Sequence, residues 1–190
     1  MLQHALKLAV LLTSLFLLPV KSSADSIDAW TVWKQPGVHA IMRHATAPGI
    51  GDPENFTLGQ CNTQRNLNDV GRQEARKLGQ TIQQKGVELT AIYSSQWCRC
   101  LHTAEELQLG AVQELPALNS FFQGRGSSSA QTTALKKHIK ALGPNEKVLY
   151  VSHQVNTTGL TGVYPDSGQI VLFRLGTNGE IEVVGTINSD

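Results

Sequence analysis

Short apolar runs recur along the chain, and each has the length and composition of a β-strand. The two clearest, 38–42 and 147–152, are rich in branched residues and are followed directly by polar residues. Further strands are predicted at 89–94, 112–115, 169–175 and 181–187. The last two flank the turn sequence Thr177-Asn178-Gly179, so they are predicted to form an antiparallel hairpin.

Helical patterns fill the stretches between most of these runs. Apolar residues recur at helical spacing in 67–82, and Asn68 or Asp69 can cap the first turn. Other helices are predicted at 26–34, 98–107, 127–142 and 154–160. Alternation of strands and helices indicates parallel strands with right-handed crossovers, and the terminal hairpin makes the sheet mixed. The pattern therefore predicts a single domain of the α/β class.

The N-terminus is predicted to be a signal peptide that covers residues 1–24. Lys7 precedes an apolar run that is short for a membrane span, and Ser22-Ser23-Ala24 provides small residues before a cleavage site. The domain then occupies 25–190, and export places it in the periplasm or outside the cell. Loss of Lys7 and Lys21 changes the formal net charge from +1 to −1, which gives no electrostatic case for a nucleic-acid or membrane partner.

Three cysteines follow the predicted signal peptide, and export favours a disulfide between two of them. Cys61 is expected to pair with either Cys98 or Cys100, which leaves one thiol free. An alternative is a thiol or metal protein built on Cys98 and Cys100, with His102 and His153 nearby. That spacing fits no zinc-ligand pattern well, so no metal or cofactor is expected.

Three of the predicted strands end in residues that suit a phosphate group. Strand 38–42 leads into Arg43 and His44, strand 89–94 leads to Arg99 on the next helix, and strand 147–152 leads to His153. The carboxyl ends of parallel strands meet at one edge, where α/β sheets bind ligands and helix N-termini favour anions. Guanidinium groups bind phosphate oxygens, and a neutral imidazole is a nucleophile.

The long polar segment 46–66 follows Arg43 and His44 directly. Its length exceeds that of most connections, which is typical of a functional loop. We expect it to form a wall of the site, and a disulfide at Cys61 would hold it against the domain.

From Ala40 to about Phe173 the chain resembles the histidine phosphatase (phosphoglycerate mutase-like) superfamily. The similarity rests on four ordered motifs. They are Ile41-Met42-Arg43-His44-Ala45, Leu67-Asn68-Asp69-Val70-Gly71-Arg72-Gln73-Glu74-Ala75, the run from Ile92-Tyr93-Ser94-Ser95 to Arg99 and Thr103-Ala104, and Val148-Leu149-Tyr150-Val151-Ser152-His153.

The resemblance implies a three-layer α/β/α sandwich with a mostly parallel mixed sheet. It implies that His44 attacks phosphorus and becomes a phosphohistidine, while Arg43, Arg99 and a protonated His153 hold the phosphate oxygens. No metal is then needed, because these groups supply the charge. The substrate would be a small phosphorylated molecule or a phosphoprotein.

Two departures from the family pattern concern the site. The acid that usually protonates the leaving group is missing at its expected positions, so Asp52, Glu54 or Glu114 is a candidate, or the reaction needs none. A further Arg of the acid phosphatase branch is also missing, and Arg65 is a candidate to replace it.

The sequence as a whole predicts an exported phosphatase that hydrolyses a phosphomonoester or phosphoramidate through His44. The alternative is a non-catalytic phosphate-binding module of the same fold that lacks the leaving-group acid.

Overall fold

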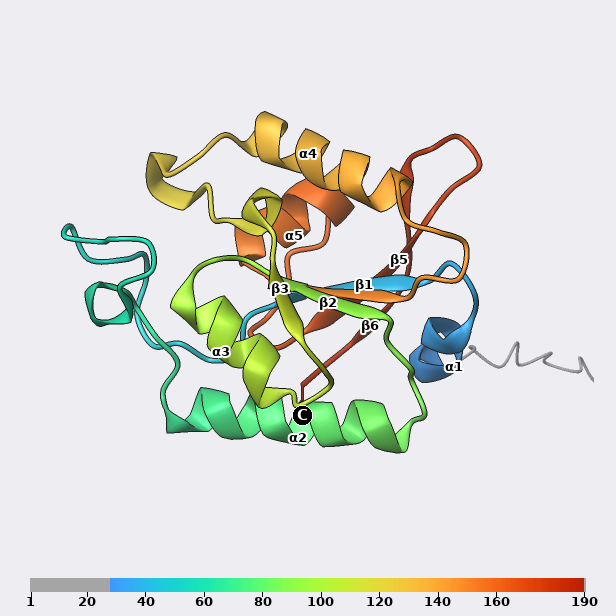
Figure 1. The fold of residues 1–190 in the computed structure, drawn as a ribbon, viewed down its shortest axis with the longest axis horizontal. Coiled ribbons are helices and arrows are strands. Elements are labelled where there is room, and N and C mark those ends of the chain that lie inside the picture. The colour runs from blue at the N-terminus through green and yellow to red at the C-terminus, as the bar shows by residue number, and fades with distance from the viewer. Residues whose placement is uncertain (1–27, 190) are drawn as a thin grey trace, which may run out of the picture.

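A six-stranded mixed sheet forms the centre of the molecule, as the computed structural model of residues 28–189 shows (Figure 1). The strands lie in the order β3-β2-β4-β1-β5-β6. The first four are mutually parallel, whereas β5 is antiparallel to β1 and to β6. The predicted fold class is confirmed, and the predicted signal peptide at 1–24 lies outside the described residues.

All predicted strands are present, with ends that differ by a few residues from the prediction. They are β1 (His39–Arg43), β2 (Ala91–Ser94), β3 (Val112–Glu114), β4 (Val148–Ser152), β5 (Ile170–Leu175) and β6 (Ile181–Ile187). The helices are α1 (Ala29–Lys34), α2 (Asp69–Gln84), α3 (Cys98–Glu106), α4 (Ser128–Lys140) and α5 (Gln154–Thr161), with short 3-10 helices η1 (Cys61–Thr63), η2 (Pro116–Leu118) and η3 (Phe122–Gly124). Within residues 28–189, no helix has the length and apolar character needed to cross a bilayer.

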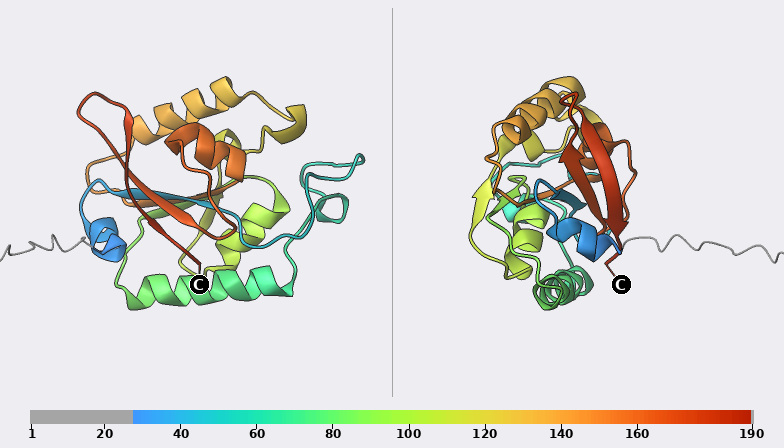
Figure 2. Two further views of the ribbon diagram at one scale, coloured as in Figure 1. Left: turned by 180° about the vertical axis from the view of Figure 1, so that it is seen from behind. Right: turned by 90° about the vertical axis from the view of Figure 1, so that its right-hand side faces the viewer.

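Helices cover both faces of the sheet, which gives three layers (Figures 1 and 2). Because side chains alternate along a strand, Ala40 and Met42 of β1 pack with α1, α2 and α3, whereas Ile41 packs with α4 and α5. Trp33 of α1 is fully buried in the first of these two cores.

The start of α2 packs directly behind the end of β1. Asn68 caps the helix, since its side chain accepts a hydrogen bond from the backbone N–H of Gly71 at 2.9 Å. A Cβ at Gly71 would lie 2.0 Å from the carbonyl oxygen of Thr46, so only glycine permits this approach. The Thr46 N–H donates to Glu74 at 2.8 Å, which further fixes the backbone that follows His44.

The carboxyl ends of β1, β2 and β4 meet at one edge of the sheet. Arg43 pairs with Ser152 in the β1–β4 register, and Ser94 pairs with Val151 in the β2–β4 register. The residues that follow these strands, His44, Ser95 and His153, therefore lie side by side. The sequence analysis predicted that these strand ends would meet at one edge of the sheet, and the register of β1, β2 and β4 confirms it.

Candidate active site

One cavity at this edge contains all five of the site residues predicted from the sequence. Its volume is about 210 Å³. It is lined by Arg43, His44, Arg65, Arg99 and His153, together with Gly49, Ile50, Gly51, Ser120, Phe122, Gln154, Val155 and Tyr164. Three guanidinium groups and two imidazoles thus share one small cavity, and none of its lining residues is a carboxylic acid.

The ring of His44 is held in one orientation by its own backbone neighbour. Its Nδ1 lies 2.7 Å from the carbonyl oxygen of Ala45, so Nδ1 carries the proton and donates it. The Ala45 N–H donates to Thr103 Oγ1, which itself donates to the carbonyl of Arg99. This arrangement leaves the lone pair of His44 on Nε2, and the hydrogen bond found for this ring within residues 28–189 is the one at Nδ1.

Burial lowers the pKa of His44 well below its usual value, and the charge of Arg99 lowers it further. The Ala45 carbonyl opposes this shift but does not reverse it. His44 is therefore neutral near pH 7, which is the state that a nucleophilic imidazole requires.

The surroundings of His153 within the chain also favour its neutral form, and the protonated His153 that the resemblance implies stays a prediction for the complex with a phosphate group. Burial lowers its pKa, and the charge of Arg99 adds to the effect. Its Nδ1 accepts from Arg99 Nη2 at 3.3 Å, and its Nε2 lies 2.9 Å from Ser95 Oγ. Ser95 in turn donates to Asn119, so the network assigns the single proton of His153 to Nε2.

Arg99 forms a buried ion pair with Asp52. Its Nη1 and Nη2 donate to the two carboxylate oxygens at 2.7 and 3.2 Å, and the two side chains are only 3% and 4% exposed. Asp52 also accepts from Trp97 Nε1 and from the backbone N–H of Arg65, both at 3.1 Å. This bidentate contact fixes the plane of the Arg99 guanidinium.

Asp52 is therefore poorly suited to be the leaving-group acid. Burial by itself raises the pKa of Asp52, but the hydrogen bonds and charge of Arg99 outweigh it and hold the pKa below its usual value. A carboxylate in this state has no proton to give at neutral pH. Glu54 and Glu114 are exposed and do not line the cavity, and Glu114 accepts a hydrogen bond from Gln96 instead.

The other two arginines reach the cavity from the end of β1 and from the loop 46–66. Arg65 donates to the carbonyls of Ala47 and Gly51, and burial lowers its pKa to about 10, so it stays charged at neutral pH. Arg43 donates from Nη1 to the carbonyl of Pro165 at 3.2 Å. Arg65 thus adds a third guanidinium group beside Arg43 and Arg99.

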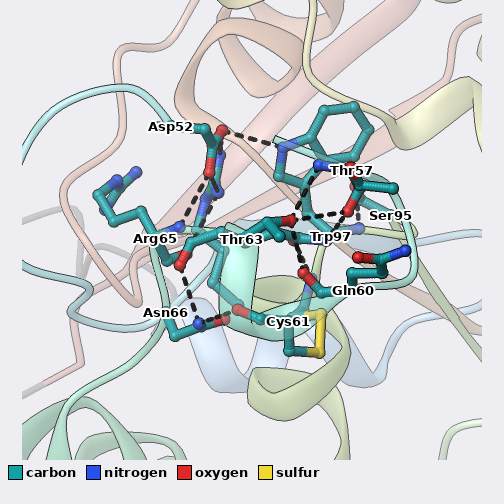
Figure 3. Close-up of a disulfide and its surroundings, with 12 residues drawn as sticks. Asp52, Thr57, Gln60, Cys61, Thr63, Arg65, Asn66, Ser95 and Trp97 are labelled. Carbon is teal, nitrogen blue, oxygen red and sulfur yellow. Dashed lines mark hydrogen bonds and ion pairs between the residues drawn. A yellow bond between two sulfur atoms is a disulfide. The ribbon is translucent and has the colours of Figure 1, made fainter. Parts of the chain in front are cut away.

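The predicted disulfide joins Cys61 to Cys98, which is the first residue of α3. Figure 3 shows this disulfide beside the loop that carries Asp52 and Arg65. Because Cys98 directly precedes Arg99, the bond fastens the loop next to the ion pair that the loop forms.

The alternative of a thiol or metal protein built on Cys98 and Cys100 gains no support from the surroundings of these two residues. Cys98 is consumed by the disulfide, and burial raises the pKa of the Cys100 thiol to about 12. In the described part of the chain, no three His, Cys, Asp or Glu side chains are grouped as a metal site requires.

Some residues of the cavity carry little signal in the sequence. Phe122 is 41% exposed and lines the cavity. Ile50 and Tyr164 also line it, although neither belongs to a motif or an apolar stripe. Their one common feature is a large apolar side chain close to loop glycines.

Residues 40–125 match the family described as the histidine phosphatase superfamily (branch 1). No curated protein matches the chain. Several solved structures share its fold, at low sequence identity.

The protein histidine phosphatase SixA, complexed with tungstate, is 19% identical, with a TM-score of 0.58 over 80% of this chain and 97% of that one. An H9A variant of a phosphoserine phosphatase from Entamoeba histolytica, in complex with phosphoserine, is 16% identical. Its TM-score is 0.60, and the match covers 80% of this chain and 97% of that one. YhfR from Bacillus stearothermophilus is 20% identical, with a TM-score of 0.58, and the match covers 77% of this chain and 94% of that one.

The family match covers the segment that contains Arg43, His44, Arg65 and Arg99, and β4 then brings His153 to the same cavity. The shared fold extends over most of the described residues. Residues 40–125 are thus similar to the histidine phosphatase superfamily (branch 1), and the solved structures named above share the fold of the chain.

Proposed function

We propose that the protein is a phosphatase that hydrolyses a phosphomonoester or a phosphoramidate through a phosphohistidine on His44. The observation that carries this proposal is the state of that imidazole. Its Nδ1 proton is engaged by the Ala45 carbonyl, its pKa is lowered, and its Nε2 keeps the lone pair. The cavity around it holds three arginines and no carboxylate.

In the first step the Nε2 lone pair attacks phosphorus, and the bond from phosphorus to the leaving group breaks. The leaving group departs with that electron pair, and the phosphoryl group is now bonded to Nε2. In the second step a water oxygen attacks phosphorus, the P–N bond breaks, and its electrons return to Nε2. The water proton goes to the released phosphate, which restores His44.

Arg43, Arg65 and Arg99 would hold the equatorial oxygens of the phosphoryl group during both steps. Charge placed in advance by the fold is usually a large catalytic contribution, and a single donor is worth about 3 kcal/mol. His153 would keep Arg99 in place through its Nδ1, and a bound dianion would favour protonation of either imidazole. These groups can supply the charge without a metal ion.

The surroundings of Asp52 favour leaving groups that depart without a proton from a carboxylic acid. The Asp52 carboxylate is paired with Arg99, and no carboxylic acid lines the cavity. Aryl esters and phosphoramidates, including phosphohistidine, have such leaving groups. The similar structures include a protein histidine phosphatase, which is consistent with a phosphoramidate substrate, whereas the phosphoserine phosphatase among them acts on an alkyl ester.

The test is turnover of p-nitrophenyl phosphate by the wild type and by His44→Ala. We expect the substitution to lower kcat/KM at least about a thousandfold. His102→Ala is the matched control, because His102 lies on α3 and does not line the cavity. In rapid quench with radiolabelled substrate, the wild type should retain acid-labile phosphate that His44→Ala lacks.

Two outcomes would contradict the proposal. Turnover that survives His44→Ala would show that another group attacks phosphorus. Binding of phosphate or vanadate by the wild type without any turnover would favour the non-catalytic phosphate-binding module instead.

We also propose that the protein is exported to the periplasm or secreted. The disulfide Cys61–Cys98 and the signal-peptide pattern of residues 1–24 support this location. A mature N-terminus near Asp25 in the exported fraction is expected, whereas an unprocessed chain in the cytoplasm would contradict export.

A further inference from the structure

Three large apolar side chains lie exposed at the mouth of the cationic cavity. Ile50 is 88% exposed, Tyr164 is 72% exposed and Phe122 is 41% exposed, and all three line the same cavity as His44. Scattered apolar residues are common on protein surfaces, but a group of them around a pocket indicates a binding function. We call these three residues the apolar rim.

Arginines of the cavity hold two of the loops that carry the rim. The Arg65 Nε donates to the carbonyl of Gly51 at 2.8 Å, directly after Ile50. The Arg43 Nη1 donates to the carbonyl of Pro165, directly after Tyr164. The backbone beside Ile50 and beside Tyr164 is therefore held by an arginine that also lines the cavity.

The loop that carries Phe122 is fastened to the loop that carries Ile50. Arg125 donates to the carbonyl of Pro53 at 3.2 Å, and its guanidinium lies 4.5 Å from the ring centre of Phe56. The side chain of Gln123 occupies the space where a Cβ of Gly51 would be, with its Oε1 only 2.5 Å from that position. These contacts give the rim a preformed shape, as ligand pockets usually have.

We propose that the apolar rim selects substrates whose leaving group carries an uncharged apolar or aromatic group next to the phosphoryl group. This inference rests on the proposed phosphatase function. The cavity has cationic groups for the phosphoryl oxygens, but no carboxylate to bind an ammonium group on the leaving group. Its volume of about 210 Å³ is below the range of about 300–1,000 Å³ for drug-sized ligands, which favours a phosphoryl group with a single ring.

Phosphonates test this selection by binding alone, because their P–C bond is not cleaved. The basicity of a leaving group therefore does not affect the measured affinity. Binding of inorganic phosphate, methylphosphonate, 2-aminoethylphosphonate and benzylphosphonate is measured by calorimetry on the disulfide-bonded protein. We expect benzylphosphonate to bind about tenfold more tightly than methylphosphonate, because the ring buries apolar surface on the rim. The aminoethyl compound should bind no better than the methyl compound.

Variants of the rim residues show whether the apolar rim causes the tighter binding of benzylphosphonate. In the double variant Ile50→Ser/Tyr164→Ser, the ratio of the affinity for benzylphosphonate to that for methylphosphonate should fall to about one. Val70→Ser is the matched control, since Val70 is exposed on α2 and does not line the cavity, and it should keep the wild-type ratio.

The outcomes separate this inference from the function on which it rests. If phosphate binds but benzylphosphonate has no advantage, or if the advantage survives the double substitution, the rim selects nothing and the inference is overturned. If neither phosphate nor any phosphonate binds, both the proposed phosphatase function and the inference about the rim are overturned.

Discussion

Asp52 determines how Arg99 is presented to the cavity. The pair is buried, and the carboxylate accepts from both terminal nitrogens of Arg99 as well as from Trp97. A charged guanidinium buried without its partner costs much more than an exposed one, because the protein interior solvates it poorly. Asp52 is therefore a positioning residue, and its charge also offsets that of Arg99.

The substitution Asp52→Asn should show how much the orientation of the Arg99 guanidinium contributes to activity, separately from its charge. Loss of the carboxylate leaves Arg99 charged but free to turn, so we expect kcat to fall about tenfold or more while KM stays level or decreases. The free energy of unfolding should fall by about 3–5 kcal/mol. Phosphatase kinetics and urea denaturation measure the two effects.

Glu106→Gln is the control for Asp52→Asn. Glu106 pairs with Arg72 and Arg76, both more than 30% exposed, so its loss should cost about 1 kcal/mol or less. Equal effects of the two substitutions would contradict the role given to Asp52.

At the scale of elements, the loop 46–66 contributes four of the residues that line the cavity, namely Gly49, Ile50, Gly51 and Arg65. It supplies Asp52, Arg65 and Ile50, yet it contains only the short helix η1 as regular structure. Its order depends on tertiary links, namely the Cys61–Cys98 disulfide and the hydrogen bonds of Arg65 and Asp52. The loop is therefore the element whose geometry is most open to perturbation.

Removal of the disulfide by Cys61→Ala/Cys98→Ala should reduce the free energy of unfolding by about 2–4 kcal/mol. The bond closes a chain segment with a sequence separation of 37, and the loss acts largely on the unfolded chain. We also expect a lower kcat/KM, because the loop that holds Arg99 through Asp52 is no longer fastened at α3.

Reductant provides the control for the disulfide. It should lower the stability and activity of the wild type but leave the double variant unchanged. A wild type that keeps its full activity and denaturation midpoint when reduced would show that the loop is ordered without the bond.

At the scale of the whole molecule, three buried histidines make the fold sensitive to acid. Burial lowers the pKa of His39 to about 4, and it lowers those of His44 and His153 well below the usual value. The unfolded chain takes up protons on these residues near pH 6.5, whereas the folded chain does not. Their contribution to stability is therefore complete above pH 6.5 and is lost as the pH falls toward the folded pKa values.

Urea denaturation at several pH values should show this loss. For His39 alone, the shift from 6.5 to about 4 corresponds to a decrease on the order of 3 kcal/mol between those pH values. His39→Gln does not titrate, so its stability should depend less steeply on pH than that of the wild type. A wild-type stability that is flat or rises from pH 6.5 to 4 would contradict the assignment.

The sequence by itself determined the fold and the residues at the strand ends. Apolar periodicity is a property of neighbouring residues, so the strands and the helices between them could be predicted from it. Because strands joined by crossover helices are parallel, their carboxyl ends lie at one edge, which brings Arg43, His44 and His153 together. Arg99 could be predicted because it lies on the first turn of the helix after such a strand.

Only the tertiary structure decided how these groups are charged and partnered. Asp52 lies 47 residues from Arg99, and nothing local to either residue indicates their ion pair. The proton of His153 and the choice of Cys98 over Cys100 likewise depend on neighbours from distant segments. A pKa and a contact are set by burial and by charges that the fold brings close, and these quantities exist only once the chain has folded.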